Sequence, residues 1–194
     1  MIQNKTLSHI SIYLDIDSVL NRFIQSALAV HSIDIKDVKM MGWHIHEWDG
    51  VNMTDDDFWR PIEALDSNFW RDIPKAEYAD ELVEFALSIT DDVHFLSSPC
   101  NNGDSFAGKY DFIRKHWPSM HRKLIVAEDK FCCSKRNSIL IDDATKHKAD
   151  WLACGGKFVL FQQPYNSMTK NYCGRDSFEL AKENLCWIIN NAKN

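Results

Sequence analysis

The sequence has no apolar run that approaches the ~20 residues needed to cross a bilayer. The longest runs, such as residues 158–161, are the size of a β-strand. The first residues lack the charged and then apolar profile of a signal peptide. None of the six cysteines stands in a C-x-x-C pair, which argues against a zinc knuckle or a thioredoxin-like motif. We therefore expect a cytoplasmic protein with no membrane partner, whose cysteines are reduced thiols.

The chain also lacks an excess of positive charge. Its 22 lysines and arginines stand against 28 aspartates and glutamates, a formal net charge of −6 with neutral histidines. Because duplex nucleic acid is bound through clustered lysines and arginines, it is not expected as the main partner. There is no internal repeat or low-complexity tract in the 194 residues, of which 45% are hydrophobic. These features predict one compact folded domain with room for a small insert.

Short apolar runs alternate with segments of helical periodicity along most of the chain. The runs are nearly continuous, as is typical of strands that are buried on both faces. This pattern predicts an α/β domain with a Rossmann-like, mostly parallel sheet and helices on both faces. The five expected strands span residues 10–14, 93–96, 124–127, 139–141 and 157–161.

Residues 32–74 interrupt this alternation. Large aromatic side chains lie there among polar ones, and Thr54, which precedes three aspartates, is suited to cap a short helix. We interpret the segment as a small, aromatic-rich helical cap, inserted into an α/β core formed by residues 1–31 and 75–194. Its large aromatic residues are Trp43, Trp48, Phe58, Trp59, Phe69 and Trp70.

Polar side chains follow four of the five expected strands, at the point where each strand ends. In a parallel sheet these ends meet at one edge, where ligands bind. Four carboxylates gathered there need a cation to remain ionised, and Mg²⁺ prefers carboxylate, water and phosphate oxygens. Hydroxyl and ammonium groups opposite them would hold a phosphate, and a carboxylate nucleophile would form an aspartyl-phosphate. In chain order the residues are Asp15 and Asp17, Ser97 and Ser98, Lys130, and Asp142 and Asp143.

The order of these residues resembles that of the haloacid dehalogenase superfamily of phosphatases. Residues 14–20, Leu-Asp-Ile-Asp-Ser-Val-Leu, look like its first motif, residues 95–97 its second, Lys130 its third and residues 141–143 its fourth. The closer resemblance is to the 5′(3′)-deoxyribonucleotidase family. In that family the second motif continues into a turn similar to Ser-Ser-Pro at residues 97–99, and a lysine such as Lys109 opens the next helix. Residues 69–74 resemble the segment that returns the cap of these enzymes to the core.

The resemblance implies a role for each acidic residue. Asp15 would be the nucleophile and a Mg²⁺ ligand, and Asp17 the general acid and base, with its backbone carbonyl on the metal. Asp143 would be a direct metal ligand, with Asp142 in support. The residues expected to hold the phosphate are Ser97, Ser98, Lys109 and Lys130.

The chain departs from the family pattern at several positions. Ser18 stands where the family usually has glycine, and Ser97 where threonine is more usual. Residues 144–146, Ala-Thr-Lys, replace the Arg-Pro turn of the mammalian members. These departures concern the substrate more than the chemistry, because the second acid, Asp17, is kept.

In the nucleotidases that this sequence resembles, aromatic residues of the cap stack on the base and shield the reaction from water. The candidates here are Trp43, Trp48, Trp59 and Trp70, since base–aromatic stacking contributes ~1–3 kcal/mol per base. The alternative is that these rings form the core of the cap itself. His44 and His46 lack an evident third metal ligand, so we expect them to be solvated or to line the cap.

The sequence thus predicts a Mg²⁺-dependent phosphomonoesterase that acts on nucleoside 5′-monophosphates, the deoxy forms above all. A sugar phosphate or another small phosphoester is an alternative substrate. A receiver-like signalling module would use similar groups, but in such modules an acid pair comes first and the phosphoacceptor follows alone. A protein that binds a metal through cysteine and histidine is a more distant alternative. The sequence leaves open the preferred base and sugar and whether the chain forms a homodimer.

Overall fold

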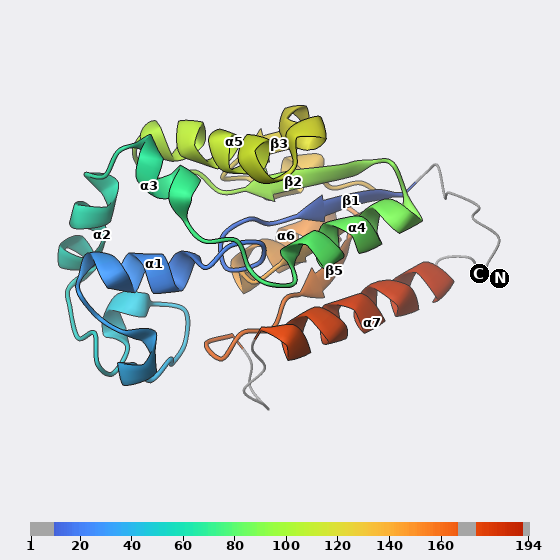
Figure 1. Cartoon of the computed structure of the whole chain (residues 1–194). Coiled ribbons are helices and arrows are strands. Elements are labelled where there is room, and N and C mark those ends of the chain that lie inside the picture. The colour runs from blue at the N-terminus through green and yellow to red at the C-terminus, as the bar shows by residue number, and fades with distance from the viewer. Residues whose placement is uncertain (1–9, 167–173, 192–194) are drawn as a thin grey trace.

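The computed structural model describes residues 10–166 and 174–191 (Figure 1). Its centre is a five-stranded sheet in the order β3-β2-β1-β4-β5, in which every neighbouring pair is parallel. The predicted α/β architecture and all five expected strands are therefore confirmed, with ends that shift by at most one residue. The strands are β1 (Ser11–Leu14), β2 (Val93–Ser97), β3 (Leu124–Val126), β4 (Ser138–Asp142) and β5 (Lys157–Leu160).

Helices connect the strands and cover the sheet. The α-helices are α1 (Phe23–Val30), α2 (Asp55–Glu63), α3 (Ser67–Asp72), α4 (Ala79–Ile89), α5 (Asp104–His116), α6 (Lys148–Ala153) and α7 (Arg175–Asn191). Five short 3₁₀ helices are also described: η1 (Ile35–Asp37), η2 (Ile45–Glu47), η3 (Pro118–Lys123), η4 (Lys130–Cys133) and η5 (Thr145–His147). None of the helices in the described part of the chain has both the length and the apolar character needed to cross a membrane.

The two faces of the sheet pack against different helices. Side chains alternate between faces along a strand, so Leu14 points to one face and Tyr13 to the other. Leu14 belongs to the main core, to which α4, α5 and α7 contribute their buried faces. Tyr13 packs with Trp151 of α6 in a smaller cluster on the opposite face. The expected placement of helices on both faces is thus observed (Figure 1).

Residues 32–74 contain the short helices η1, η2, α2 and α3, and the buried cluster to which they contribute begins earlier in the chain. The buried side chains of α1, among them Phe23 and Leu28, pack with Trp48 and Phe58 of this segment rather than with the main core. The amino-acid composition indicates that the segment starts at residue 32. The packing of side chains, by contrast, groups α1 with the segment. From here on, residues 23–73 are called the insert. Figure 1 shows the insert beyond the arrowheads of β1 and β2, at the carboxyl edge of the sheet.

The insert joins the core through two chain segments that lie side by side. Asn21 and Lys75 form an isolated antiparallel bridge. The backbone N–H of Arg22 donates to the carbonyl of Pro74 at 2.9 Å, and that of Ala76 to the carbonyl of Leu20, also at 2.9 Å. Within the insert, Thr54 caps α2 as predicted, accepting a hydrogen bond from the backbone of Asp57 at 3.2 Å.

Helix α3 of the insert lies directly against α5 of the core, and this approach requires a glycine. A Cβ atom placed on Gly108 would lie 2.3 Å from the Cβ of Trp70 and 2.5 Å from the carbonyl oxygen of Ser67. Both atoms are fixed by the backbone of α3, so neither can rotate away. Gly108 is therefore needed for the contact, although glycine is a poor residue for a helix interior.

We predict that Gly108→Ala lowers the free energy of unfolding by about 1–3 kcal/mol, because overpacking outweighs the gain in helix propensity. Urea unfolding measures the change. Gly103→Ala is the matched control in the same region, since a Cβ there has no neighbour within 4 Å, and its change should stay within about 0.5 kcal/mol. Equal stability of Gly108→Ala and the wild type would contradict the close approach of the two helices.

Candidate active site

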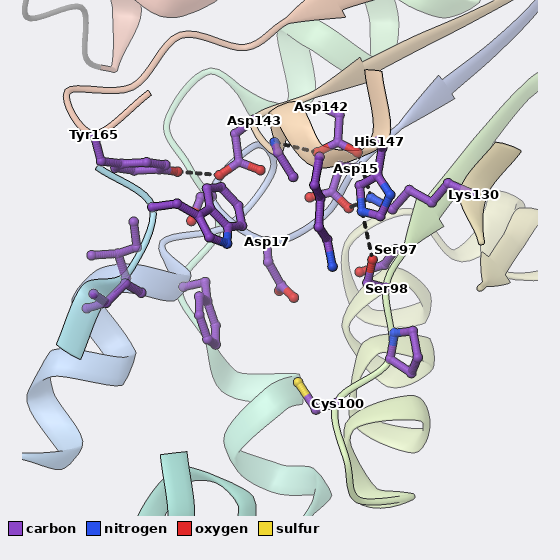
Figure 2. A pocket seen from close by; sticks show the side chains of 18 of the residues that line it. Asp15, Asp17, Ser97, Ser98, Cys100, Lys130, Asp142, Asp143, His147 and Tyr165 are labelled. Carbon is purple, nitrogen blue, oxygen red and sulfur yellow. Dashed lines mark hydrogen bonds and ion pairs between the residues drawn. The ribbon is translucent and has the colours of Figure 1, made fainter. Parts of the chain in front are cut away.

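A pocket of about 270 Å³ lies between the carboxyl edge of the sheet and the insert. Every residue that follows a strand and was singled out in the sequence contributes to its wall, and so does Lys109 (Figure 2). Among the predicted residues, the pocket thus brings together side chains up to 143 − 15 = 128 positions apart, as expected from a parallel sheet. The predicted polar residues that line it are Asp15, Asp17, Ser97, Ser98, Lys109, Lys130, Asp142 and Asp143.

Lys130 bridges two buried carboxylates at the floor of the pocket. Its Nζ donates to Asp15 Oδ1 at 2.7 Å and to Asp142 Oδ2 at 2.8 Å, and its side chain is 2% exposed. Burial alone would lower the pKa of Lys130, but the two carboxylates raise it above its ordinary value. Lys130 is therefore a fixed positive charge between the ends of β1 and β4.

Lys109 forms the second positive centre. It extends from α5 to donate to Ser97 Oγ at 3.0 Å and to the carbonyl of Ser98 at 2.7 Å, and it pairs with Asp17 Oδ2 at 2.8 Å. Burial would lower the pKa of Lys109, but the charge and hydrogen bond of Asp17, with Cys100 and Asp15, together outweigh burial and the net shift is upward. Trp70 lies beneath this ammonium, which is 5.5 Å from the centre of the indole ring. Lys109 is thus held in place by β2, the β1 loop and the insert.

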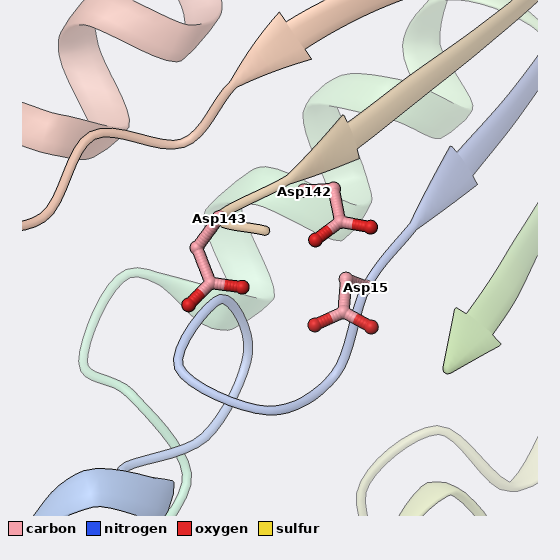
Figure 3. Close-up of side chains that lie close together, drawn as sticks. All are labelled: Asp15, Asp142 and Asp143. Atoms are coloured by element: carbon pink, nitrogen blue, oxygen red, sulfur yellow. The ribbon is translucent and has the colours of Figure 1, made fainter. Parts of the chain in front are cut away.

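Three carboxylates meet where β1 and β4 end (Figure 3). One oxygen from each of Asp15, Asp142 and Asp143 lies within 4.8 Å of the other two, and all three residues are buried. Burial, opposed by Lys130, raises the pKa of Asp15 to about 7. Burial and then the charge of Asp15 raise the pKa of Asp143 well above its usual range. A bound cation would remove this electrostatic cost.

The donor set fits Mg²⁺, which takes carboxylate oxygens and keeps part of its water shell. Asp142 uses both oxygens within the protein: Oδ2 accepts from Lys130, and Oδ1 accepts from the backbone N–H of Ala144 at 2.8 Å. Among the hydrogen bonds of the described residues, Asp15 Oδ2 and Asp143 Oδ1 have no protein donor. These two oxygens are therefore the ones that remain for a cation.

The loop after β1 explains one departure from the family pattern. Ser18 has φ of +62°, a left-handed conformation in which glycine is normally preferred. The backbone N–H of Ser18 donates to Asn21 Oδ1 at 3.1 Å, and Asn21 also donates to Asp17 Oδ1 at 2.9 Å. Asn21 therefore fixes both the turn and the second acid, and it compensates for the missing glycine.

Tyr165, which follows β5, is a residue of the site that the sequence pattern did not predict. Its hydroxyl donates to Asp143 Oδ2. Burial, and next the charge of Asp143, raise the pKa of Tyr165 well above its ordinary value, so the phenol stays protonated. A weak signal was present, because polar residues follow β5 at Gln162 and Gln163, but only after Phe161, and Tyr165 lies two residues further along.

Two further residues of the pocket wall were not predicted. His147 Nε2 and Ser98 Oγ share a hydrogen bond of 3.2 Å. Burial and the nearby Lys130 lower the pKa of His147 to about 4, so the ring is neutral at physiological pH. Burial raises the pKa of the Cys100 thiol to about 11, which makes it an unreactive wall residue rather than a nucleophile.

The four candidate tryptophans divide into two groups. Trp43, Trp48 and Trp59 lie in the wall of the pocket. Trp43 is 45% exposed, whereas Trp48 is fully covered and donates through its ring nitrogen to the carbonyl of Gly42. Trp70 does not reach the pocket and is only 1% exposed. The expectation that Trp70 is a candidate for base stacking is therefore wrong, because the contact of α3 with α5 buries its ring below Lys109.

The histidine pair does not form a metal centre with its neighbours. His44 is exposed, and His46 pairs with Asp55 at 3.0 Å. Within residues 10–166 and 174–191, the aspartate group at β1 and β4 is the only set of three or more such side chains close enough to share one ion. The five cysteines in these ranges are free thiols.

The family model described as "5' nucleotidase, deoxy (Pyrimidine), cytosolic type C protein" matches residues 8–189. The chain belongs to this family. It is accordingly a phosphatase-type hydrolase of the haloacid dehalogenase class, and the receiver-like alternative is set aside. None of the curated proteins matches the sequence.

Solved structures of haloacid dehalogenase hydrolases share the fold. A subfamily IA, variant 1 hydrolase from Geobacter sulfurreducens superimposes with a TM-score of 0.50 at 12% identity, over 81% of this chain and 89% of that one. A haloacid dehalogenase-like hydrolase from Xanthomonas campestris has a TM-score of 0.49 at 12% identity, over 91% of each chain. The first of these likenesses supports the fold over the 81% of this chain that it covers.

We predict that Lys130→Met lowers the free energy of unfolding by about 3–5 kcal/mol in the presence of EDTA, because it leaves two buried carboxylates without their partner. Lys146→Met is the matched control. Lys146 pairs with Glu128 at 3.2 Å with both side chains more than half exposed, so its loss should cost no more than about 1 kcal/mol. Similar losses for the two variants would show that Lys130 does not balance buried charge.

Proposed function

We propose that this protein is a Mg²⁺-dependent phosphomonoesterase that hydrolyses (deoxy)nucleoside 5′-monophosphates through an aspartyl-phosphate on Asp15. The proposal depends mainly on one observation. The Asp15 carboxylate is buried at the end of β1, in contact with Lys130 and within 4.8 Å of Asp142 and Asp143, and it lines a pocket that aromatic residues of the insert close.

In the proposed first step, Asp15 Oδ1, the oxygen beside Lys130, attacks phosphorus and the bond to the 5′ oxygen of the nucleoside breaks, while Oδ2 is left for the cation. Asp17, two residues along the same loop, donates the proton that this leaving oxygen needs. In the second step Asp17 removes a proton from water, which attacks phosphorus and breaks the bond to Asp15. The products are the nucleoside and inorganic phosphate, and both aspartates return to their starting states.

Lysines and serines of the pocket supply the phosphate contacts in this proposal. Lys109 already touches Ser97 and the Ser98 carbonyl, so its ammonium and the two hydroxyls form one side of a phosphate site. Lys130 lies on the other side, beside the nucleophile. Positive charge on both sides stabilises the negative charge that spreads over the phosphoryl oxygens in the transition state.

Asp15 and Asp143 would hold Mg²⁺ through their free oxygens, with Asp142 in support through Lys130. The backbone carbonyl of Asp17 completes the proposed protein ligands. When bound, the cation neutralises phosphate charge and allows the carboxylates to remain ionised together. The protein itself orients Asp15, excludes water with the insert and moves the proton through Asp17.

The insert favours a nucleoside over a sugar as the leaving group. Trp43 is partly exposed in the pocket wall, and Phe23, Ile45 and Trp59 line the same side. Planar and apolar walls suit a nucleobase, which can stack on them, whereas a sugar phosphate would leave them without a partner. The same chemistry would cleave many small phosphoesters, and the aromatic wall of the pocket favours nucleotides among them.

Initial rates on a panel of phosphate esters test the proposal. We expect ribo- and deoxyribonucleoside 5′-monophosphates to exceed sugar phosphates in kcat/KM, EDTA to abolish the activity, and Mg²⁺ to restore it. At saturating Mg²⁺, Trp43→Ala should lower kcat/KM for nucleotides by about 5- to 100-fold, the equivalent of losing one stacking contact, and lower kcat/KM for a small ester such as p-nitrophenyl phosphate much less. Preference for a sugar phosphate would overturn the substrate assignment but not the chemistry.

Two isosteric variants test the assigned roles of the acids. Asp15→Asn should reduce turnover by more than about a thousand-fold, because an amide cannot form the covalent intermediate. Asp17→Asn should reduce it by about 10²–10⁴-fold, while still allowing slow phosphorylation of Asp15. Mass spectrometry of acid-quenched samples would detect the trapped phosphate. Near wild-type hydrolysis by Asp15→Asn would refute the assignment of Asp15 as the nucleophile. Unchanged turnover by Asp17→Asn would refute the assignment of Asp17 as the general acid and base.

A further inference from the structure

The segment that follows β5 is tied to the loops that carry the acids. Gln163 donates through its side chain to the carbonyl of Ser18 at 2.7 Å, in the loop after β1. Asn166 donates to the carbonyl of Asp143 at 2.8 Å and to that of Phe161 at 3.0 Å. Gln163 and Asn166 are also joined to each other, since the backbone N–H of Gln163 donates to Asn166 Oδ1 at 2.8 Å. One short segment therefore braces both acid-bearing loops.

Tyr165 is the central side chain of this segment. Its hydroxyl reaches Asp143 Oδ2 (Figure 2), and its ring packs against two tryptophans of the insert. The ring centres lie 6.0 Å from Trp43 and 5.6 Å from Trp48. Tyr165 is 7% exposed, and it belongs to the buried cluster of the insert although it follows a strand of the core. It thus contacts a site carboxylate at one end and the insert at the other.

The hydrogen bond fixes which oxygen of Asp143 faces the other carboxylates. A carboxylate on a short side chain can rotate about its last bond, and each rotation changes the oxygen that a cation meets. Because Tyr165 occupies Oδ2, Oδ1 of Asp143 remains available. Groups that hold a metal ligand in this way change metal affinity by about 10–100-fold when they are removed.

We propose that Tyr165 is a positioning residue that holds Asp143 in the orientation needed to bind the divalent cation. The ring is in turn fixed by Trp43 and Trp48, so the insert supports the cation site through Tyr165. The inference rests on the proposed function only in that it assumes a cation at Asp15 and Asp143. It adds a role for a residue outside the acidic and phosphate-binding groups assigned above.

Calorimetric titration of the full chain with Mg²⁺ alone, without nucleotide, tests the inference. Tyr165→Phe keeps the ring and removes the hydroxyl, and we expect it to weaken Mg²⁺ binding by about ten-fold or more. Tyr13→Phe is the matched control, because Tyr13 is also buried but packs against His94 and Trp151, away from the carboxylates. Its Mg²⁺ affinity should equal that of the wild type.

Activity measurements separate positioning from simple packing. In Tyr165→Phe the Mg²⁺ concentration for half-maximal activity should rise with the dissociation constant, and kcat should recover at saturating Mg²⁺. A purely structural role would lower the melting temperature and leave Mg²⁺ affinity unchanged. Asn166→Ala provides a second variant, since it removes the bond to the Asp143 carbonyl, and it too should weaken Mg²⁺ binding.

The outcomes distinguish this inference from the proposed function. If the wild type binds Mg²⁺ and Tyr165→Phe binds it equally well or more tightly, the positioning role is overturned and the proposed function stands. If the wild type binds no Mg²⁺, both are overturned. If Tyr165→Phe does not fold, unchanged Mg²⁺ affinity in Asn166→Ala overturns the positioning role of the segment.

Discussion

The charge balance between buried lysines and carboxylates at the carboxyl edge of the sheet is the constraint on which the site depends. Four aspartates face the two buried lysines, Lys109 and Lys130, so these six groups carry a charge of 2 − 4 = −2 when all of them are ionised. Lys130 forms ion pairs with Asp15 and Asp142, and Lys109 forms an ion pair with Asp17. Asp143 has a phenol as its partner instead of a cation. Burial first, and then the charge of neighbouring aspartates, raises the pKa values of Asp15 and Asp143. A divalent cation fits there because it would balance the remaining negative charge.

The sequence predicted this part of the structure well, because parallel sheets follow a strict register. Leu14 pairs with Phe95 on one side and with Ile141 on the other. The residues that directly follow neighbouring strands therefore lie close together, independent of the length and conformation of the connecting segments. Apolar runs with polar ends contain this information locally, which is why Asp15 and Asp142 could be placed together from the sequence alone.

The remaining features depend on packing between distant segments, which no local pattern encodes. Helix α1 has the periodicity of a core helix, yet its apolar face meets Trp48 and Phe58 of the insert. Trp70 looks like its neighbours in composition, but the small size of Gly108 allows α3 to approach α5 and bury it. Tyr165 differs for another reason: β5 is followed by the apolar Phe161, so no polar residue stands directly at the end of this strand, and Tyr165 comes five residues after Leu160.

The position of Tyr165 has a consequence for how the two parts of the molecule act together. The insert is joined to the core by two adjacent chain segments and by the packing of α3 on α5, and Tyr165 adds a further connection through its ring and hydroxyl. Any ligand that orders Trp43 or Trp48 therefore also favours the tyrosine position that orients Asp143. Such linkage is reciprocal, so a cation that fixes Asp143 favours the same arrangement of the tryptophans. Aromatic residues that shield the phosphate and carboxylates that bind the cation are in this way parts of one interaction network.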